Sequence, residues 1–412
     1  MLIALICSDF PPLRTSAAVQ IRDLALEFLA QGHEPVVLVP TEDLGAPWRE
    51  ERFQGVRVLR LAAPAVRAPG YVRRTLAELS LPFAMIRGLA RSPLRDARWD
   101  GVAWYSPTTF FGPLIWWLKR RAGCPGYLIL RDIFPEWALD LGLLRKGPVY
   151  AFFKGVANLQ YAMADTIGVQ TPSNLPYMAA WSGKGGRTLE VLQNWLAPAP
   201  DVGSSIQVAT TPLAGRKLFV YIGNMGIAQG MDIFIDLATQ LKPRADLGFL
   251  FVGRGSDVPR LGAMARERGL DNVMFHDEVD TREMPGLLAQ CQAGLLALDP
   301  KHKTHNIPGK FLTYLQAGLP VLARVNPGTD VANLIEGERV GAAYTGHSVE
   351  EFAAIATRLV DDAAGRQGMG ERGRALQARM FSPRSAVAQV VAGLRRDAAR
   401  LGTTVAGRDG TT

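Results

Sequence analysis

Short apolar runs alternate along the chain with longer stretches in which apolar positions recur every three or four residues. The short runs are bounded by turn residues and are typical of buried strands, and the longer stretches are typical of amphipathic helices. In the first half of the chain the expected strands are residues 2–7, 35–39, 56–61, 102–105, 127–130, 167–170 and 189–193. Strands that alternate with helices in this way predict a doubly wound α/β fold with a parallel sheet.

A second series of the same kind follows a change in composition. Residues 196–213 are rich in Ala, Pro, Gly, Ser, Thr and Val and carry almost no charge, which is typical of a linker. After them the expected strands are residues 218–222, 247–252, 273–275, 293–297 and 320–323, with 342–344 as a further candidate. We therefore predict one domain over residues 1–197 and a second over 198–382, then a helix over 383–401 and a disordered tail over 402–412.

Length and composition agree with two globular domains. The chain has 412 residues, of which 48% are hydrophobic and 20% charged, enough to bury two substantial cores. Its three cysteines show no metal-ligand spacing, which favours a reducing compartment without a structural disulfide. The first residues lack a basic leader, and prolines and a glycine interrupt the uncharged run over 101–118, so we expect neither a signal peptide nor a transmembrane helix.

A net charge of +8 indicates an anionic partner. Basic residues outnumber acidic ones over residues 71–121, where they are interleaved with Phe83, Met85, Ile86, Trp104, Phe110, Phe111, Trp116 and Trp117. This pattern suits a surface that lies on anionic lipid, and equally a core in which the large apolar side chains are buried. Nucleic acid is the weaker candidate because no recognised nucleic-acid-binding motif is present.

Residues 305–323 predict a turn, a short helix and a buried strand. Pro308 and Gly309 mark the turn, and Gly318 ends the helix. Lys310 then falls in the first turn of the helix, where a cation opposes the helix dipole. An anion bound between its ammonium and the free N–H groups of that turn would remove the conflict, whereas the alternative is a solvated surface lysine.

Two glycine-rich turns follow neighbouring strands of the second series. The first turn carries Gly223, Gly226 and Gly230. Without a Cβ, glycine lets the backbone approach a ligand closely. The second turn, residues 253–255, adds the guanidinium of Arg254, and residues 299–305 add two lysines and His305 just before Lys310. Because the carboxyl ends of parallel strands share one edge of a sheet, these groups together predict a site for a nucleotide diphosphate.

Polar residues also follow two strands of the first half. The loop over residues 8–18 leaves the first strand at the edge where open α/β sheets bind ligands, and it lacks the glycine-rich fingerprint of an NAD-binding domain. This loop contains Arg14, Ser16 and Ala17. Another strand is followed by Arg131, Asp132 and Glu136. We favour Asp132 as a site residue, because Glu136 near a helix start also suits the helix dipole without any further role.

Four motifs carry a resemblance to a known family. They are Arg-Asp-Ile-Phe-Pro-Glu at residues 131–136, Leu-Gln-Asn-Trp at 192–195, the glycine turn at 223–230 and Ile-Pro-Gly-Lys at 307–310. In this order and spacing they resemble the GT-B fold retaining glycosyltransferases of family four, in which three of the motifs read Arg-Asp-Leu-Trp-Pro-Glu, Leu-Pro-Asn-Trp and Ile-Pro-Ser-Lys. Within that family the chain is similar to the bacterial amino-sugar transferases that build O-antigen, lipopolysaccharide or capsule on a lipid carrier.

The resemblance implies two Rossmann-like domains that face each other across a cleft, with the acceptor on the first, the nucleotide sugar on the second, and the last helix returning to the first. It implies a donor-binding set of Ser16, Ala17, Gly223, Asn224, Gly226, Arg254, His305, Lys310 and Thr313. It places on the acceptor side Arg14, Arg131 and Glu136. We expect the catalytic residues to be Asp132, near the reacting hydroxyl, with Arg254 and Lys310, and Asn194 to lie at the hinge.

Four positions depart from the family pattern. The wider family has two glutamates separated by seven residues, and His305 and Thr313 occupy their positions here. A threonine hydroxyl makes fewer hydrogen bonds to a ribose diol than a carboxylate does. Asn224 and Gln229 replace an arginine and a lysine of the family's glycine turn. Arg254 and Lys310 are therefore the main candidates for the cations that bind the diphosphate. Donor affinity and nucleotide preference are therefore open.

These observations predict a retaining, metal-independent glycosyltransferase. The expected donor is a UDP-sugar carrying an N-acetylated amino sugar, the expected acceptor is a lipid-linked or lipopolysaccharide glycan, and no cofactor is expected besides the donor. The expected location is the cytoplasm, in peripheral contact with the inner face of the plasma membrane. Two alternatives remain, a UDP-sugar 2-epimerase on the same fold and a non-catalytic partner of a glycosyltransferase complex.

Overall fold

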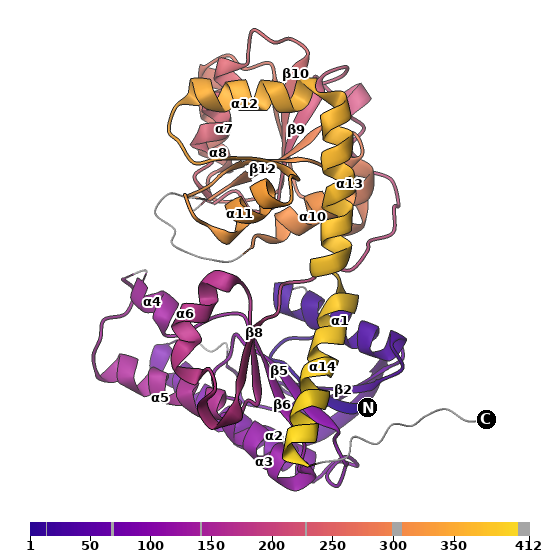
Figure 1. Cartoon of the computed structure of the whole chain (residues 1–412), viewed down its shortest axis with the longest axis vertical. Coiled ribbons are helices and arrows are strands. Elements are labelled where there is room, and N and C mark those ends of the chain that lie inside the picture. The colour runs from indigo at the N-terminus through magenta and orange to yellow at the C-terminus, as the bar shows by residue number, and fades with distance from the viewer. Residues whose placement is uncertain (14, 67–69, 141, 227–228, 299–306, 403–412) are drawn as a thin grey trace, which may run out of the picture. The chain divides into compact units, whose positions relative to one another are not determined.

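The computed structural model describes residues 1–412 except 14, 67–69, 141, 227–228, 299–306 and 403–412, and except the side chain of Tyr71. Two predicted site residues, Arg14 and His305, therefore lie outside the described residues, as does nearly all of the predicted tail. The chain divides into two compact units, each built on one sheet (Figure 1). The N-terminal unit comprises Met1–Gln193 and the chain from Pro383 onward, and the C-terminal unit comprises Asn194–Ser382.

The N-terminal unit has an eight-stranded sheet in the order β3-β4-β2-β1-β5-β6-β7-β8. Its strands are β1 (Leu2–Ile6), β2 (Glu34–Thr41), β3 (Trp48–Phe53), β4 (Val56–Ala62), β5 (Gly101–Tyr105), β6 (Gly126–Leu130), β7 (Thr166–Val169) and β8 (Thr188–Val191). Neighbouring strands are parallel except β3 and β4, which are antiparallel. The sequence patterns predict seven of these strands and miss β3, because this edge strand is mostly polar and largely solvent-facing.

Helices cover both faces of this sheet. One face carries α1 (Ser16–Ala30) and α14 (Pro383–Leu401), which contact each other. The other face carries a layer of α2 (Tyr71–Ala90), α3 (Gly112–Ala122) and α5 (Pro148–Ala162), in which α3 contacts both of its neighbours. The short helices α4 (Glu136–Asp140) and α6 (Leu175–Met178) follow β6 and β7. Because side chains alternate along a strand, the central strands supply apolar residues to both helical layers.

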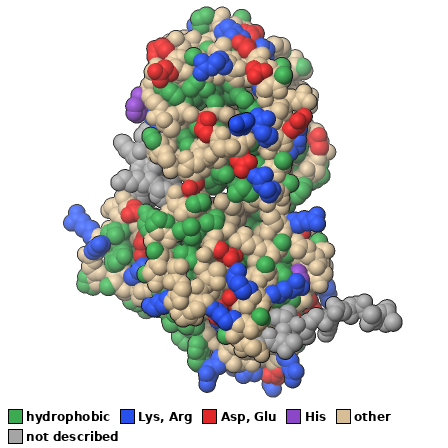
Figure 2. Space-filling model, in the orientation of Figure 1, with side chains coloured by type: hydrophobic (Ala, Val, Ile, Leu, Met, Phe, Trp, Pro, Cys, Tyr) green, Lys and Arg blue, Asp and Glu red, His purple; other side chains and the backbone are tan. Residues whose placement is uncertain are grey.

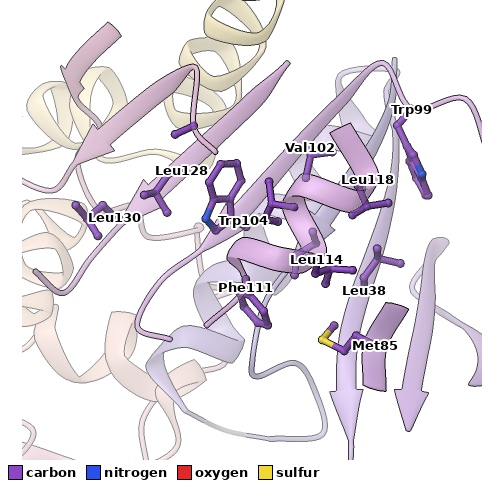
Figure 3. Close-up of a cluster of buried hydrophobic side chains, with 14 of the residues drawn as sticks. Leu38, Met85, Trp99, Val102, Trp104, Phe111, Leu114, Leu118, Leu128 and Leu130 are labelled. Carbon is purple, nitrogen blue, oxygen red and sulfur yellow. The ribbon is translucent and has the colours of Figure 1, made fainter. Parts of the chain in front are cut away.

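The core under the layer of α2, α3 and α5 contains much of the apolar content of residues 71–121. Met85, Trp104 and Phe111 are fully buried there, against strand residues such as Leu38 and Leu128 (Figure 3). Phe83 and Trp116, from the same stretch, are 61% and 53% exposed. The two interpretations of this stretch, core and surface, thus apply to different residues.

The last helix, α14, is fixed against β7 and β8 by buried polar contacts. The Thr166 hydroxyl donates to the carboxylate of Asp397 at 2.6 Å, and burial raises the pKa of that carboxyl. Gln389 Nε2 donates to the Glu190 carboxylate at 2.9 Å and to the Val191 carbonyl at 2.8 Å. The N-terminal unit is therefore completed by the end of the chain.

The C-terminal unit has a six-stranded, all-parallel sheet in the order β11-β10-β9-β12-β13-β14. Its strands are β9 (Lys217–Ile222), β10 (Leu247–Val252), β11 (Val273–His276), β12 (Ala293–Ala297), β13 (Val321–Arg324) and β14 (Gly341–Tyr344). One face packs against α7 (Asp232–Gln240), α8 (Val258–Glu267) and α12 (Val349–Asp361). The other face packs against α9 (Met284–Leu288), α10 (Gly309–Ala317), α11 (Asp330–Gly337) and α13 (Ala363–Met380). The sequence predicts all six strands.

Residues 196–213 are not a free linker, and this prediction is wrong. Ile206 and Leu213 are buried in the core of the C-terminal unit, and the N–H of Val208 donates to Gln290 Oε1 at 2.9 Å. The small residues of this segment serve close packing, since a Cβ on Gly286 would lie 2.5 Å from the backbone of Gly203. Low charge and small side chains fit close packing as well as flexibility, and the composition alone does not separate the two.

Candidate functional site

The candidate donor site begins where two glycine turns pack against each other at the carboxyl ends of β9 and β10. The chain leaves β9 at Gly223, with a φ of 99°, and the N–H of Gly223 donates to the Val252 carbonyl at 2.9 Å. It leaves β10 at Gly253, with a φ of 147°. A Cβ at Gly253 would lie 2.0 Å from the carbonyl oxygen of Gly223. Only glycine allows this backbone-to-backbone contact.

The same two turns hold the backbone of Arg254. The N–H of Met225 donates to the Arg254 carbonyl at 2.8 Å, and a Cβ at Gly255 would lie 2.1 Å from the Met225 carbonyl oxygen. The side chain of Arg254 is 78% exposed and lies 3.1 Å from the exposed carboxylate of Glu278. Because an exposed ion pair contributes little free energy, the guanidinium can exchange Glu278 for a phosphate at small cost.

Lys310 reaches the first glycine turn through Tyr221, a residue of β9. Its Nζ donates to the Tyr221 hydroxyl at 2.6 Å and lies 4.2 Å from the centroid of the Tyr221 ring. The Tyr221 hydroxyl in turn donates to the Asn224 carbonyl at 2.9 Å. Burial raises the pKa of Tyr221, so its hydroxyl keeps the proton that this bond requires. Lys310 is therefore held in place by a buried aromatic side chain that also contacts the turn.

Burial also sets the charge of Lys310, because desolvation lowers its pKa to about 8. The ammonium is thus retained at neutral pH and is lost more readily than that of a solvated lysine. An anionic ligand would favour the charged form. This result differs from the solvated surface lysine that the sequence leaves open.

The helix that carries Lys310 is anchored to the sheet by Tyr314. The Tyr314 hydroxyl accepts a hydrogen bond from the N–H of Ile222 at 3.2 Å and lies 3.1 Å from the Leu295 carbonyl. Its ring fills the space that a side chain at Gly294 would need, since a Cβ there would lie 2.5 Å from the ring. The residue before it, Thr313, donates from Oγ1 to the Gly309 carbonyl, one turn earlier on the same helix, at 3.3 Å. The orientation of α10 is thus fixed by buried contacts to β9 and β12.

In the N-terminal unit, Arg131 and Asp132 follow β6. The buried guanidinium of Arg131 donates from Nη1 to the Leu192 carbonyl at 2.6 Å and from Nη2 to the Gln193 carbonyl at 3.2 Å. These bonds hold the chain where it leaves β8, which is a structural role, and the acceptor-side role of Arg131 stays a prediction. Asp132 is half-buried, and its pKa is raised by burial against the opposing charge of Arg131.

Glu136, the first residue of α4, points into the N-terminal unit. Its Oε1 accepts a hydrogen bond from Lys154 Nζ of α5, and its Oε2 is buried with no hydrogen-bond partner among the described residues. Burial, and after it the charge of Glu136, raises the pKa of Tyr161. The side chain of Glu136 is 13% exposed and forms an ion pair with Lys154. Its acceptor-side role stays a prediction.

Ser16 and Ala17 form the first turn of α1, where the sequence suggests a loop. The hydroxyl of Thr15 accepts a hydrogen bond from the N–H of Ala18 at 3.2 Å and donates to Asp9 at 2.8 Å. Ser16 is exposed and Ala17 half-buried. A helix start with small side chains offers its N–H groups to an anion, which is compatible with the predicted donor contact.

Two site residues, Tyr221 and Tyr314, are missed by the sequence reasoning. Tyr221 lies inside an apolar strand, and Tyr314 follows Thr313 on the apolar face of a helix, so each is indistinguishable from a core aromatic by pattern. Because the hydroxyl of a buried tyrosine needs a hydrogen-bond partner, a tyrosine in an apolar pattern indicates a polar contact inside the core, and this is the signal in the sequence that could have identified both residues. Within the described ranges, no three His, Cys, Asp or Glu side chains gather as a metal site. In that same part of the chain, no helix has the length and apolar character to span a bilayer.

Two family models match the chain, one over each half. The model described as "Glycosyl transferase 4-like domain" matches residues 15–195, and that described as "Glycosyl transferases group 1" matches residues 216–362. The first falls on the N-terminal unit and the second contains the two glycine turns, Lys310 and Thr313. The matches therefore assign the candidate donor site to the second model.

Two curated proteins are similar to the chain over part of their length. WbjE of Pseudomonas aeruginosa, described as a glycosyltransferase, is 23% identical over 230 residues, which cover 54% of this chain and 57% of WbjE. WcaI of Escherichia coli K12, described as a glycosyl transferase of colanic acid biosynthesis, is 27% identical over 335 residues, which cover 74% of this chain and 79% of WcaI. The chain thus spans little more than half of WbjE and most of WcaI.

A solved structure is similar to the chain over nearly its whole length. HepE of Anabaena, in complex with UDP and glucose, superposes with a TM-score of 0.64 at 16% identity, covering 96% of this chain and 100% of HepE. At this identity the likeness concerns the fold. Together with the two parallel-sheet Rossmann-like units, it confirms the predicted fold class.

Proposed function

This chain belongs to the GT-B glycosyltransferases whose two domains those family models describe, and on that premise we propose that it transfers an N-acetylated amino sugar from a UDP-sugar to a lipid-linked or lipopolysaccharide glycan. We propose further that transfer retains the anomeric configuration and requires no metal ion. UDP is supported by the complex of HepE, and a glycan acceptor by the description of WcaI as a glycosyl transferase of colanic acid biosynthesis. The amino sugar rests on the resemblance of the four sequence motifs.

The observation that carries this proposal is the connection of both cations to one glycine turn. The N–H of Met225 in that turn donates to the Arg254 carbonyl. The Asn224 carbonyl accepts a hydrogen bond from the Tyr221 hydroxyl, which in turn accepts one from Lys310 Nζ. Lys310 is preorganised, whereas Arg254 is exposed and can move onto a ligand. A diphosphate placed at the turn would meet both positive charges.

The chemistry that such a site supports is loss of a diphosphate. The oxygen of the acceptor hydroxyl bonds to the anomeric carbon, the bond from that carbon to the phosphate oxygen breaks, and the hydroxyl proton passes to the leaving phosphate. Negative charge develops on the diphosphate as that bond breaks. The positive charge of Lys310, which is held in place by Tyr221, lowers the barrier because it stabilises the developing charge without reorganising, and Arg254 adds a second positive charge once it has moved onto the diphosphate.

Asp132 is the candidate for orienting the acceptor hydroxyl. Its carboxyl follows β6 at the carboxyl edge of the sheet, and burial raises its pKa. A carboxylate there accepts a hydrogen bond from a sugar hydroxyl, which directs the oxygen lone pair toward the donor. Asp132→Asn keeps the shape of the side chain and replaces one acceptor oxygen by an NH₂ group. We expect this substitution to lower kcat strongly and to change the KM for the donor little.

The proposal is tested on Lys310. We expect Lys310→Met to lower the rate of UDP release from UDP-N-acetylglucosamine, with a membrane extract as acceptor, by about 10²–10³-fold, the loss typical of one transition-state donor. Lys242→Met, which removes an exposed lysine of the same unit, is the matched control. Near-normal turnover of Lys310→Met would exclude Lys310 as an electrostatic catalyst.

The donor nucleotide is tested by ligand-induced stabilisation of the purified protein. UDP-sugars are expected to raise the melting temperature more than GDP- or dTDP-sugars, because stabilisation follows affinity for the folded state. The 2-epimerase alternative is not favoured by the family matches, and it predicts release of free amino sugar from a UDP-sugar alone. Binding of UDP without transfer to any acceptor would instead support the non-catalytic partner.

A further inference from the structure

We propose that the outward faces of α2, α3 and α5 form a single surface that binds an anionic lipid bilayer. The three helices lie side by side on one face of the N-terminal sheet, with α3 in contact with both neighbours. Each uses one apolar face to cover the sheet, through residues such as Met85, Leu114 and Tyr161. Each also carries large apolar residues on the opposite side.

The exposed residues of α2 repeat with helical spacing. Val72, Leu76 and Phe83 are 75%, 61% and 61% exposed, and their spacing places them on one side of the helix. Leu81 and Met85, on the other side, are buried in the core. Since the sheet already occupies one apolar face, the second apolar face of α2 is not explained by the fold.

The same arrangement recurs on α5. Val149, Phe152 and Leu159 are 57%, 42% and 47% exposed, and Ala157 on the inward side is buried. Trp116 extends the surface across α3, between the two other helices. Figure 2 shows hydrophobic side chains gathered on the N-terminal unit on the side where Figure 1 places α4 and α5. Three neighbouring helices therefore present one apolar surface.

The charge of these three helices indicates which kind of partner binds their outward surface. Glu78 is the only acidic residue in their sequences, and it pairs with Arg74 at 3.1 Å. The basic residues are Arg73, Arg74, Arg87, Lys119, Arg120, Arg121 and Lys154. Of these, Arg73, Arg87 and Arg120 have no ion-pair partner among the described residues. An apolar surface with unpaired arginines is complementary to acyl chains below and anionic head groups around them.

Trp116 fits the same occupant. The Arg120 guanidinium lies 6.0 Å from the Trp116 ring centroid, so an exposed indole and a cation lie next to each other on the surface of α3. Indole rings favour the boundary between head groups and acyl chains because they combine an apolar body with an N–H donor. A second protein chain would instead favour acidic groups opposite the arginines, and these helices offer almost none for a second copy.

This inference rests on the proposed function, which places the acceptor on a lipid, but lipid binding is measured without donor or acceptor. The two can therefore fail separately. It also differs from the sequence expectation in its residues. α5 lies outside the stretch 71–121, and Trp104 and Phe111 of that stretch are buried in the core (Figure 3).

The test is vesicle flotation of the full-length protein. We expect binding to phosphatidylcholine vesicles containing phosphatidylglycerol, weaker binding to pure phosphatidylcholine, and loss of binding as salt is raised. Phe83→Ser with Phe152→Ser is expected to weaken binding about tenfold or more, because two inserted aromatic side chains are removed. Arg73→Gln with Arg87→Gln is expected to weaken binding about fivefold per residue on the anionic vesicles alone.

Matched controls lie on the C-terminal unit. Val202→Ser removes a side chain that is 58% exposed, and Arg266→Gln removes an exposed arginine, and neither is expected to change binding. Because the double Phe variant could fail to fold, Trp116→Phe supplies a second measurement. The fluorescence difference between wild type and Trp116→Phe should shift to shorter wavelength when anionic vesicles are added.

Three results would overturn the inference. One is absence of binding to anionic vesicles by the wild-type protein. Another is binding that the controls weaken as much as the helix variants do. The third is self-association that Phe83→Ser with Phe152→Ser abolishes while lipid binding persists, which would make the surface a contact between two copies.

Discussion

The contact between Tyr221 and Lys310 yields a prediction with a definite pH dependence. Tyr221→Phe removes only the hydroxyl, which accepts the 2.6 Å bond from Lys310 Nζ and donates the 2.9 Å bond to the Asn224 carbonyl. The ring stays, and with it the contact of the ammonium with the ring at 4.2 Å. The substitution therefore removes these two hydrogen bonds, together with the longer contact of the hydroxyl with Gln229 Oε1 at 3.4 Å.

The expected magnitude follows from the charge of Lys310. A hydrogen bond to a charged group contributes about 1.5–3 kcal/mol and one between neutral groups about 0.5–1.5 kcal/mol. Near pH 7, below the Lys310 pKa of about 8, Tyr221→Phe should therefore lower the free energy of unfolding of the C-terminal unit by about 2–4 kcal/mol. At about pH 9.5 the lysine is neutral, and the loss should shrink by about 1 kcal/mol.

The assay is urea unfolding followed by circular dichroism at both pH values. The transition of the C-terminal unit is identified by its shift when UDP is added. Wild type, Tyr221→Phe, Lys310→Met and the double variant form a cycle whose non-additive term is the energy of the contact. A non-additive term that is zero, or equal at both pH values, would refute the bond between a charged Lys310 and the Tyr221 hydroxyl.

Four further predictions concern the same unit. The kcat/KM for the donor should fall as pH rises through about 8, and Lys310→Arg should move the fall to higher pH, so a flat profile in the wild type would contradict the role of the ammonium. The free energy of unfolding should respond in the opposite sense. The pKa of Lys310 is about 8 in the folded protein and 10.5 for an ordinary lysine, so between these pH values the unfolded chain binds more protons than the folded one. The contribution of Lys310 to stability should therefore increase as the pH rises from about 8 to 10.5. Gly253→Ala should destabilise the unit by about 2 kcal/mol or more through its contact with Gly223, whereas Gly262→Ala in α8 should not, as calorimetry would show. Thr313→Glu should tighten UDP-sugar binding about tenfold in calorimetric titration by restoring a carboxylate, and unchanged affinity would exclude a ribose contact there.

Much of the architecture follows from the sequence because buried parallel strands leave a strong local signal. Residues 247–252 and 293–297 are continuous apolar runs, and the strands have those bounds. β3 leaves no such signal, because its residues are mostly polar. It is a strand because its backbone pairs with that of β4. Pairing between strands is a long-range property, and local composition does not report it.

The candidate site is predictable in its backbone and less so in its side chains. Gly223 and Gly253 are marked by the steric demand of close approach, which glycine alone meets. Lys310 is marked by its conflict with the helix dipole. Its partner Tyr221 is not, because a tyrosine in a buried strand looks like any other core aromatic until the lysine is placed above it. Likewise, the burial of the Arg131 guanidinium against backbone carbonyls depends on β8, about sixty residues later in the chain.

The position of α14 has a consequence for biosynthesis. The strands β6, β7 and β8 are made in the first half of translation, but the helix that covers their second face leaves the ribosome after the whole C-terminal unit. Until then, Tyr127 and its neighbours on that face lack the helix that packs against them. The nascent chain must therefore carry an unfinished first unit through the synthesis of the second, and a premature stop codon before Pro383 would leave that apolar face open to aggregation.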